Sequence, residues 1–190
     1  MITKLLAAFS RLVSSGSPGV QSWSSEECQD VKAKAEQGDA EAQFDLGMGY
    51  VAGWIGVRDF SLAAKWLRKS AEQGNPDGQF AFGAHCHKGE GVPQDCQQAV
   101  RWYRAAAEQG HRVAAFNLGY CYEVGEGVEK NLVEAHAWYA LRIKIDDDQD
   151  AAKARVDLER RMSTQQLADA NKRAEELRLK ISAKLSDKGK

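Results

Sequence analysis

Metal-ligating side chains stand next to one another in the segment His85-Cys86-His87. Cys96 follows ten residues after Cys86, and Cys121 lies further along the chain. Imidazole nitrogen and thiolate sulfur bind zinc and haem iron, so this group is a candidate metal or haem site. In a helix, however, the side chains of His85 and His87 point about 200° apart and cannot bind one ion. The alternative is a buried thiol at Cys86 between two surface histidines.

A disulfide is the second chemistry that these cysteines could support. Cys86 falls at the end of one expected helix and Cys96 at the start of the next, so a bridge across the turn is geometrically conceivable. The chain holds four cysteines and no Cys-x-x-Cys pair, which is too few for a disulfide-dense secreted scaffold. Both states stay open, and a cytoplasmic protein with small buried thiols is the simpler interpretation.

Catalytic chemistry finds little support in the residue pattern. The sequence contains neither Ser-x-x-Lys nor His-Glu-x-x-His, and no nucleophile stands beside a positioned base. The string Gly-Glu-Gly-Val, at 89–92 and 125–128, is not a phosphate-binding loop, because it follows an expected helix rather than a strand. We therefore expect a protein that is not an enzyme and that has no cofactor, no metal and no small-molecule substrate.

Charge and hydropathy exclude two further classes. The 190 residues carry 26 Lys plus Arg against 27 Asp plus Glu, so the formal net charge is −1. This balance gives no electrostatic basis for binding nucleic acid. No run of about 18 apolar residues occurs, so we expect no integral membrane segment. With 43% hydrophobic residues, the chain can bury the core of one domain or one repeat array.

The elements that must position these residues follow a period of 36 residues. Blocks of this length align column by column from residues 38, 74 and 110, and Ala-Glu-Gln-Gly recurs at the same place in each period. The shared columns include Phe44, Phe80 and Phe116; Gly47, Gly83 and Gly119; Gly53, Gly89 and Gly125; and Trp66, Trp102 and Trp138. Such self-similarity is typical of stacked helical repeats.

Each block is predicted to hold two helices joined by a glycine-rich turn. Leu46 and Gly47 lie on the apolar face of the first helix. A glycine inside a helix costs about 1 kcal/mol relative to alanine, so its recurrence predicts a close approach of two helix backbones. The second helix starts after a capping residue in one column, namely Asp59, Asp95 or Asn131. Because no block can bury both faces alone, we expect an all-α fold, an alpha-alpha superhelix or solenoid of stacked antiparallel helix pairs.

The blocks resemble a known repeat family. Residues 42–74 contain Ala-Gln-Phe-Asp-Leu-Gly and end in Trp-Leu-Arg-Lys-Ser-Ala-Glu-Gln-Gly. Residues 78–110, with Gly-Glu-Gly-Val and Trp-Tyr-Arg-Ala-Ala-Ala-Glu-Gln-Gly, match more closely. This pattern resembles the Sel-one-like repeat (SLR), a relative of the tetratricopeptide repeat. The resemblance implies an adaptor that binds other proteins. A cysteine-rich secreted branch of the family has been described as penicillin-binding or β-lactamase-like, but this chain lacks the corresponding nucleophile motif.

Two blocks depart from the family pattern. The first reads Gly53-Trp54-Ile55-Gly56-Val57 at its turn, which leaves the turn geometry open. The third replaces the closing Ala-Ala-Glu-x-Gly by residues 142–146, which suggests the terminal repeat. The expected organisation is a lead-in at 1–23, a capping helix at 24–37, repeats at 38–73, 74–109 and 110–145, and C-terminal capping helices at 146–190.

The C-terminal part is predicted to form two helices, near 149–161 and from 163 to about 184, the second opened by a capping box at Ser163. The Arg-Met-Ser-x-x-Gln pattern at its start resembles terminal SLR segments of bacterial proteins and implies a bacterial source. The residues expected to face the solenoid are Val156, Leu158, Leu167, Ala170, Ala174, Leu177 and Ile181. The alternative is a free dimerising coiled coil.

Residues 1–22 allow three interpretations. Ile2, Leu5, Leu6 and Phe9 share one helical face, and Arg11 interrupts the apolar stretch that a secretory signal needs. The segment is either a loosely docked lead-in, a signal for export, or an amphipathic helix that binds a membrane surface or a partner. The last interpretation gives the alternative function, a membrane-peripheral assembly factor anchored by residues 1–15.

The function that we expect first is a non-catalytic interaction module. First helices would line a concave face that binds a peptide or a helix of a partner protein. The face opposite Leu46 supplies the candidates. The candidate partner-binding residues are Asp45, Met48, His85, Lys88, Asn117 and Tyr120. Tyr120 is the strongest of them, because an exposed tyrosine in a groove is a common hot spot. The competing interpretation is that Tyr120 packs under the C-terminal helix.

Overall fold

The computed structural model describes residues 23–143 and 149–188, and every regular element in these two ranges is an α-helix. The helices are α2 (Ser25–Glu36), α3 (Ala40–Ala52), α4 (Phe60–Glu72), α5 (Pro76–Lys88), α6 (Cys96–Ala107), α7 (Arg112–Val124), α8 (Leu132–Ile143), α9 (Gln149–Glu159) and α10 (Thr164–Lys188). The all-α prediction is confirmed.

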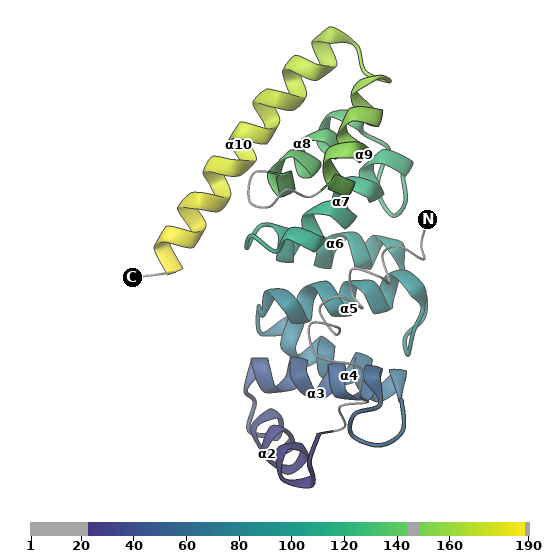
Figure 1. Cartoon of the computed structure of the whole chain (residues 1–190), viewed down its shortest axis with the longest axis vertical. Coiled ribbons are helices and arrows are strands. Elements are labelled where there is room, and N and C mark those ends of the chain that lie inside the picture. The colour runs from purple at the N-terminus through teal and green to yellow at the C-terminus, as the bar shows by residue number, and fades with distance from the viewer. Residues whose placement is uncertain (1–22, 144–148, 189–190) are drawn as a thin grey trace.

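The helices stack in sequence order to form a solenoid. α2 packs against α3, each helix from α3 to α8 packs against the helix before it and the helix after it, and α3–α4, α5–α6 and α7–α8 form the three repeat pairs. Figure 1 shows these pairs piled along the long axis of the molecule. One continuous core runs from Ala64 in α4 to Leu177 in α10. The predicted superhelix of helix pairs is confirmed.

The predicted starts of the second helices are confirmed, and the glycines of one shared column end the first helices. Side-chain oxygens accept hydrogen bonds from the backbone N–H three residues later at Asp59, Asp95 and Asn131. Gly53, Gly89 and Gly125 end their helices in the left-handed conformation, with φ near +80°. A side chain at such a position would be strained, which explains why glycine recurs in this column.

The glycine within each first helix lies where two helices of a pair approach most closely. A Cβ atom built on Gly47 would lie 2.7 Å from Cγ of Leu67, and one on Gly119 would lie 2.8 Å from Cδ1 of Tyr139. Backbone atoms of the second helix are also only 3.2 Å from these positions. The predicted close backbone approach is therefore confirmed.

The second glycine of each Gly-Glu-Gly turn joins one repeat to the preceding one. A Cβ atom on Gly91 would lie 1.9 Å from the carbonyl oxygen of Phe60, at the start of α4. The same atom on Gly127 would lie 2.1 Å from the carbonyl oxygen of Cys96, at the start of α6. The atypical turn of the first repeat has no such contact, because nothing lies within 4 Å of the corresponding position on Gly56. These turns therefore hold the second and third repeats in register.

Glutamine pairs within the first and second repeats add polar contacts that continue to the preceding helix. Gln73 donates to the side-chain oxygen of Gln43 at 2.7 Å, and Gln109 donates to that of Gln79 at 2.8 Å. Gln43 and Gln79 are buried and donate in turn to the backbone oxygens of Ala35 and Ala71. The recurring Glu-Gln-Gly string thus marks a buried hydrogen-bond network, a role that the sequence reasoning did not assign.

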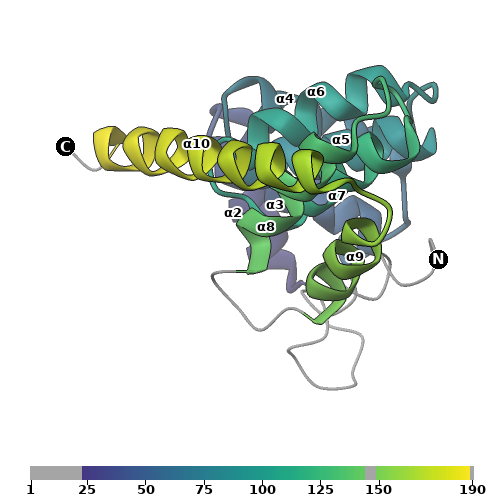
Figure 2. The ribbon, with the colours of Figure 1, turned by 90° about the horizontal axis from the view of Figure 1, so that it is seen from above.

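The C-terminal helices pack on the last repeat. α9 and α10 both contact α8, and Figure 2 shows α10 crossing the end of the stack and projecting beyond it. Leu158, Ala170 and Leu177 are buried as predicted. The free coiled coil is therefore contradicted. Val156 was expected to face inward, but this prediction is wrong: Val156 is 43% exposed. Positions two apart on a helix point in nearly opposite directions, and Leu158 takes the inward one.

The tryptophan column is not uniform. Trp138 is buried beside Leu177 of α10, and Trp66 and Trp102 are half-buried against other parts of the core. All three tryptophans pack in the array as predicted, but the depth of burial depends on what covers each repeat. The last tryptophan is covered because α10 lies over α8.

At the N-terminal end, α2 is the predicted capping helix. Ser24 and Glu27 form a capping box at its start, and Ala35 is fully buried against α3. Residues 1–22 and the closing segment 144–148 lie outside the described residues, so the interpretations of both segments remain predictions. Among the helices that the structure describes, none has the length and apolar composition needed to cross a bilayer.

Candidate functional site

Asp45 and Met48, the candidate contacts of the first repeat, are partly exposed side chains of α3. Asp45 is half-buried, and burial raises the pKa of its carboxyl group, with a further rise from the charges of Glu41, Asp39 and Asp77. Met48 is half-buried and packs against the central core. The charge of Asp77, in the first turn of α5, raises the pKa of Asp45 in α3, and the two helices contact each other, so they are neighbours in the stack.

The candidates of α7 have different surroundings. Asn117 lies half-buried beside the hydroxyl of Tyr103, to which its side chain hydrogen-bonds, and its own side-chain oxygen has no hydrogen-bond partner. Tyr120 is half-buried and close enough to Tyr139 to contribute to the raised pKa of that phenol, although burial is the larger cause. We give the name first-helix face to a set of half-buried side chains at equivalent positions of the three first helices, namely Asp45 and Met48 in α3, Ala84 in α5, and Asn117 and Tyr120 in α7. Lys88, at the end of α5, is exposed and lies 3.8 Å from Glu90.

His85 does not lie at the surface, so the expectation of an exposed histidine is wrong. Its side chain is 4% exposed, its Nδ1 atom is 2.8 Å from the carbonyl oxygen of Glu90, and its ring meets Phe60 edge-on. The repeat alignment held a signal for this burial. The same column contains Gly49 and Cys121, which are both buried, so the position faces the interior in every repeat.

The burial of His85 makes stability depend on pH. Burial lowers the pKa of His85 below its usual 6.5, so the folded protein resists protonation there, whereas the unfolded chain takes up the proton near pH 6.5. The stabilising contribution is present above this pH and is lost as the pH falls below it. Between about pH 7.5 and about pH 5.5, we expect the free energy of unfolding to fall less in a His85→Gln variant than in the wild type.

Urea denaturation, monitored by circular dichroism at the two pH values, measures the free energy of unfolding of each protein. Glutamine keeps a donor for the Glu90 carbonyl and removes the titration. Equal pH dependence in the two proteins would contradict the assignment.

The two neighbouring histidines use different partners, as their helical spacing predicted. His85 contacts Glu90 in its own repeat, whereas Nε2 of His87 lies 3.1 Å from Oε1 of Glu126 in the next repeat. The side chains of His85, Cys86 and His87 therefore point to different surroundings and do not form one site. The structure brings His87 together with residues of two other elements.

The buried cysteines are not activated nucleophiles. All four cysteines are free thiols, so Cys86 and Cys96 are not bridged. Burial raises the pKa of Cys86 to about 11 and that of Cys121 to about 12. Both thiols are therefore protonated at neutral pH, and Cys86 donates a hydrogen bond to Gln98 at 2.9 Å.

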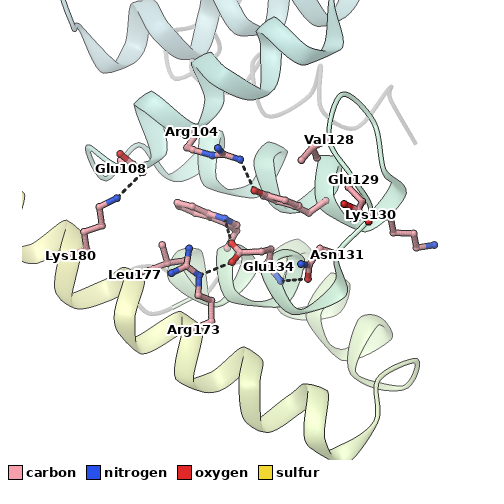
Figure 3. Close-up of a pocket in the computed structure, with 12 residues that line it drawn as sticks. Arg104, Glu108, Val128, Glu129, Lys130, Asn131, Glu134, Arg173, Leu177 and Lys180 are labelled. Carbon is pink, nitrogen blue, oxygen red and sulfur yellow. Dashed lines mark hydrogen bonds and ion pairs between the residues drawn. The ribbon is translucent and has the colours of Figure 1, made fainter.

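A pocket of about 510 Å³ lies between α6, the turn before α8, α8 and α10 (Figure 3). Its basic side chains largely contact groups of the protein itself. Arg173 donates to Glu134 at 2.7 Å, and Lys180 donates to Glu108 at 3.0 Å. Arg104 donates to the hydroxyl of Tyr122. The pocket is therefore best explained as the polar part of the contact between α10 and the array.

Antiparallel helix pairs that stack in sequence order, each packed on the next, define an α-solenoid repeat protein. Residues 40–75, 76–111 and 112–141 match the family model of the Sel1 repeat. The chain belongs to the Sel1 repeat family. Proteins of this family are generally non-catalytic scaffolds that bind other proteins. The family resemblance inferred from the repeat motifs is thereby confirmed, and no curated protein matches the chain.

Solved structures of bacterial proteins share the fold. The structure of c5321, a protective antigen of uropathogenic Escherichia coli with an SLR fold, is 34% identical, with a TM-score of 0.77 over 83% of this chain and 34% of that one. A Sel1 repeat protein from Oxalobacter formigenes is 36% identical, with a TM-score of 0.63 over 69% and 98% of the two chains. Helicobacter pylori cysteine-rich protein B, at 21% identity and a TM-score of 0.53 over 67% and 96%, shares the fold. The chain spans about a third of the E. coli protein that it matches.

Proposed function

We propose that this protein is a non-catalytic adaptor that binds a peptide or helix of a partner protein on the first-helix face. The observation that carries the proposal is the half-buried carboxyl group of Asp45, placed among three other acids beside the half-buried Met48. A carboxylate held partly out of water among like charges is unfavourable, and a cation from a partner would relieve this cost.

The chemistry of the face suggests the kind of partner. Met48, Ala84 and Tyr120 offer partly accessible apolar surface, and flexible methionine side chains adapt well to bound helices. The acids lie near the start of α3 and α5. We therefore expect an apolar helix or peptide with Lys or Arg at the end that lies over Asp45. The reduced thiols agree with a cytoplasmic location, which is part of this proposal.

The test begins with affinity purification of the full chain from its native host, comparing the wild type with Tyr120→Ala and Asp45→Asn. The exposed Arg101 of α6 supplies the control variant Arg101→Ala. With a purified partner, we expect Tyr120→Ala to weaken binding about 30-fold, equivalent to about 2 kcal/mol. Asp45→Asn is expected to weaken binding several-fold at low salt and less at high salt.

Asn117→Ala is a poorer probe than the sequence suggested, because Asn117 supports Tyr103 inside the array. Circular dichroism must show that each variant keeps the helical content of the wild type. If Tyr120→Ala and Asp45→Asn retain the same partners with the same affinity as Arg101→Ala, the first-helix face is not the binding surface.

A further inference from the structure

Three potential metal ligands from three different elements meet at the junction of the second and third repeats. His87 comes from the last turn of α5, Cys96 is the first residue of α6, and Glu126 lies in the turn between α7 and α8. Their ligand atoms all lie within 4.8 Å of one another. From this geometry we propose that His87, Cys96 and Glu126 bind one zinc-class divalent transition-metal ion, which joins the second repeat to the third.

The distances agree with shared coordination. In a tetrahedral zinc site, bonds of about 2.0 Å to nitrogen and oxygen and about 2.3 Å to sulfur place N and O ligand atoms about 3.3 Å apart, and S and O about 3.5 Å apart. Nε2 of His87 lies 3.1 Å from Oε1 of Glu126, and Sγ of Cys96 lies 3.5 Å from the same oxygen. The third pair of ligand atoms, Nε2 of His87 and Sγ of Cys96, lies within 4.8 Å.

The imidazole of His87 provides a second indication. Its Nε2 atom is buried and makes no hydrogen bond, although the carboxylate of Glu126 is close by. A buried ring nitrogen without a hydrogen bond is costly in a folded protein. Coordination of an ion between the ring and the carboxylate would give this nitrogen a partner.

The backbone holds the ligands in place before any ion binds. Gly127 packs so closely on α6 that a Cβ atom on it would lie 2.1 Å from the carbonyl oxygen of Cys96, and this contact fixes the turn that carries Glu126. The side chain of Gln94 donates to the backbone oxygen of His87 at 2.9 Å and fastens the end of α5. Because these contacts already position the ligands, binding of an ion would require little further loss of conformational entropy.

The electrostatics favour a cation at this point. The thiol of Cys96 donates a hydrogen bond to the carboxylate of Glu126, so two groups that are anionic when deprotonated lie side by side. When a divalent ion binds, the thiol would lose its proton to solvent as the sulfur–metal bond forms, and the ion would neutralise both anionic ligands. Nitrogen, sulfur and oxygen donors together suit Zn²⁺ or Co²⁺ rather than Mg²⁺ or Ca²⁺.

The cluster is not a requirement of repeat packing. At the preceding junction, Glu90 takes the place of Glu126, but the other two places hold Val51 and Phe60, which cannot bind a metal. The Gly-Glu-Gly turn therefore packs on the preceding repeat at both junctions. Of these two junctions, the one between the second and third repeats presents three metal ligands, and the other does not. Three protein ligands would leave the fourth tetrahedral position to water.

Cobalt titration of the reduced, chelator-treated full chain tests the proposal. We expect one equivalent of Co²⁺ to give visible ligand-field bands and a thiolate-to-cobalt charge-transfer band, and Zn²⁺ to displace it. Cys96→Ser should abolish the charge-transfer band, whereas the control Cys28→Ser, at another half-buried thiol, should keep it. His87→Gln and Glu126→Gln should each weaken Co²⁺ binding at least about tenfold.

Thermal unfolding supplies a second readout. Zn²⁺ should raise the Tm of the wild type and of Cys28→Ser, should not raise that of Cys96→Ser, and Mg²⁺ should have no such effect. If Cys96→Ser does not fold, the two conservative variants at His87 and Glu126 carry the test alone. The proposal is wrong if the wild type shows no charge-transfer band with excess Co²⁺. It is equally wrong if the band persists in Cys96→Ser, or if the His87 and Glu126 variants bind Co²⁺ as tightly as the wild type.

Discussion

Replacing Gly91 with alanine is expected to destabilise the array by about 3 kcal/mol or more, because the substitution combines backbone strain with a direct clash. Gly91 has a φ of +75°, which L side chains rarely adopt, and its Cβ would lie 1.9 Å from the carbonyl oxygen of Phe60. Backbone cannot rotate away as a flexible side chain can. The second repeat must therefore shift from the first, which breaks the shared core.

Gly56→Ala is the matched control for Gly91→Ala. Gly56 also has a positive φ, at +117°, but nothing lies within 4 Å of its Cβ position. The control should show the conformational cost alone, about 1–3 kcal/mol. Urea denaturation monitored by circular dichroism measures both variants. If Gly91→Ala were no less stable than Gly56→Ala, docking of the turn on the preceding repeat would not hold the repeats together.

Leu177→Ala is expected to lower the free energy of unfolding by about 2–4 kcal/mol and to loosen α10 from the array. Leu177 is 2% exposed and forms part of the continuous core together with Trp138 of α8. Truncation leaves a cavity over the indole that the long helix covers. Denaturation curves give the loss of stability, and limited proteolysis within α10 reports the loosening.

Leu179→Ala supplies the control two residues further along the same helix. Leu179 is 57% exposed, so its truncation should change stability by no more than about 0.5 kcal/mol. Both variants change the same side chain on the same helix and differ only in the face on which it lies. Similar stability of the two variants would show that α10 does not depend on its contact with α8.

The candidate site was only partly predictable from the sequence. The repeat alignment placed Asp45 and Met48 on a common face, and the structure brings the acids of α3 and α5 together there. From the sequence we did not predict that His85 is buried, although the neighbouring repeats carry small buried residues in that column. A single histidine looks polar and exposed, and only comparison of equivalent positions reveals its interior environment.

The meeting of His87, Cys96 and Glu126 could not be predicted from the motif that first suggested a metal. The sequence grouped adjacent histidines and cysteines, but adjacent residues on a helix point in different directions. Glu126 lies 39 residues after His87 and belongs to the next repeat. Its approach depends on how closely the turn of one repeat docks on the helix of another, which is a property of the inter-repeat contact.

The sequence by itself determined the period, the helix pairs, the capping residues and the glycines of the turns. These features are local and recur in three repeats. The aligned repeats therefore give three examples of each position in nearly the same environment. Only the tertiary structure decided that Leu158 rather than Val156 faces inward, that α10 covers Trp138, and which polar groups meet across a junction. These outcomes depend on the angle and spacing between successive helix pairs, which are set by packing between residues far apart in the chain and leave no periodic signal.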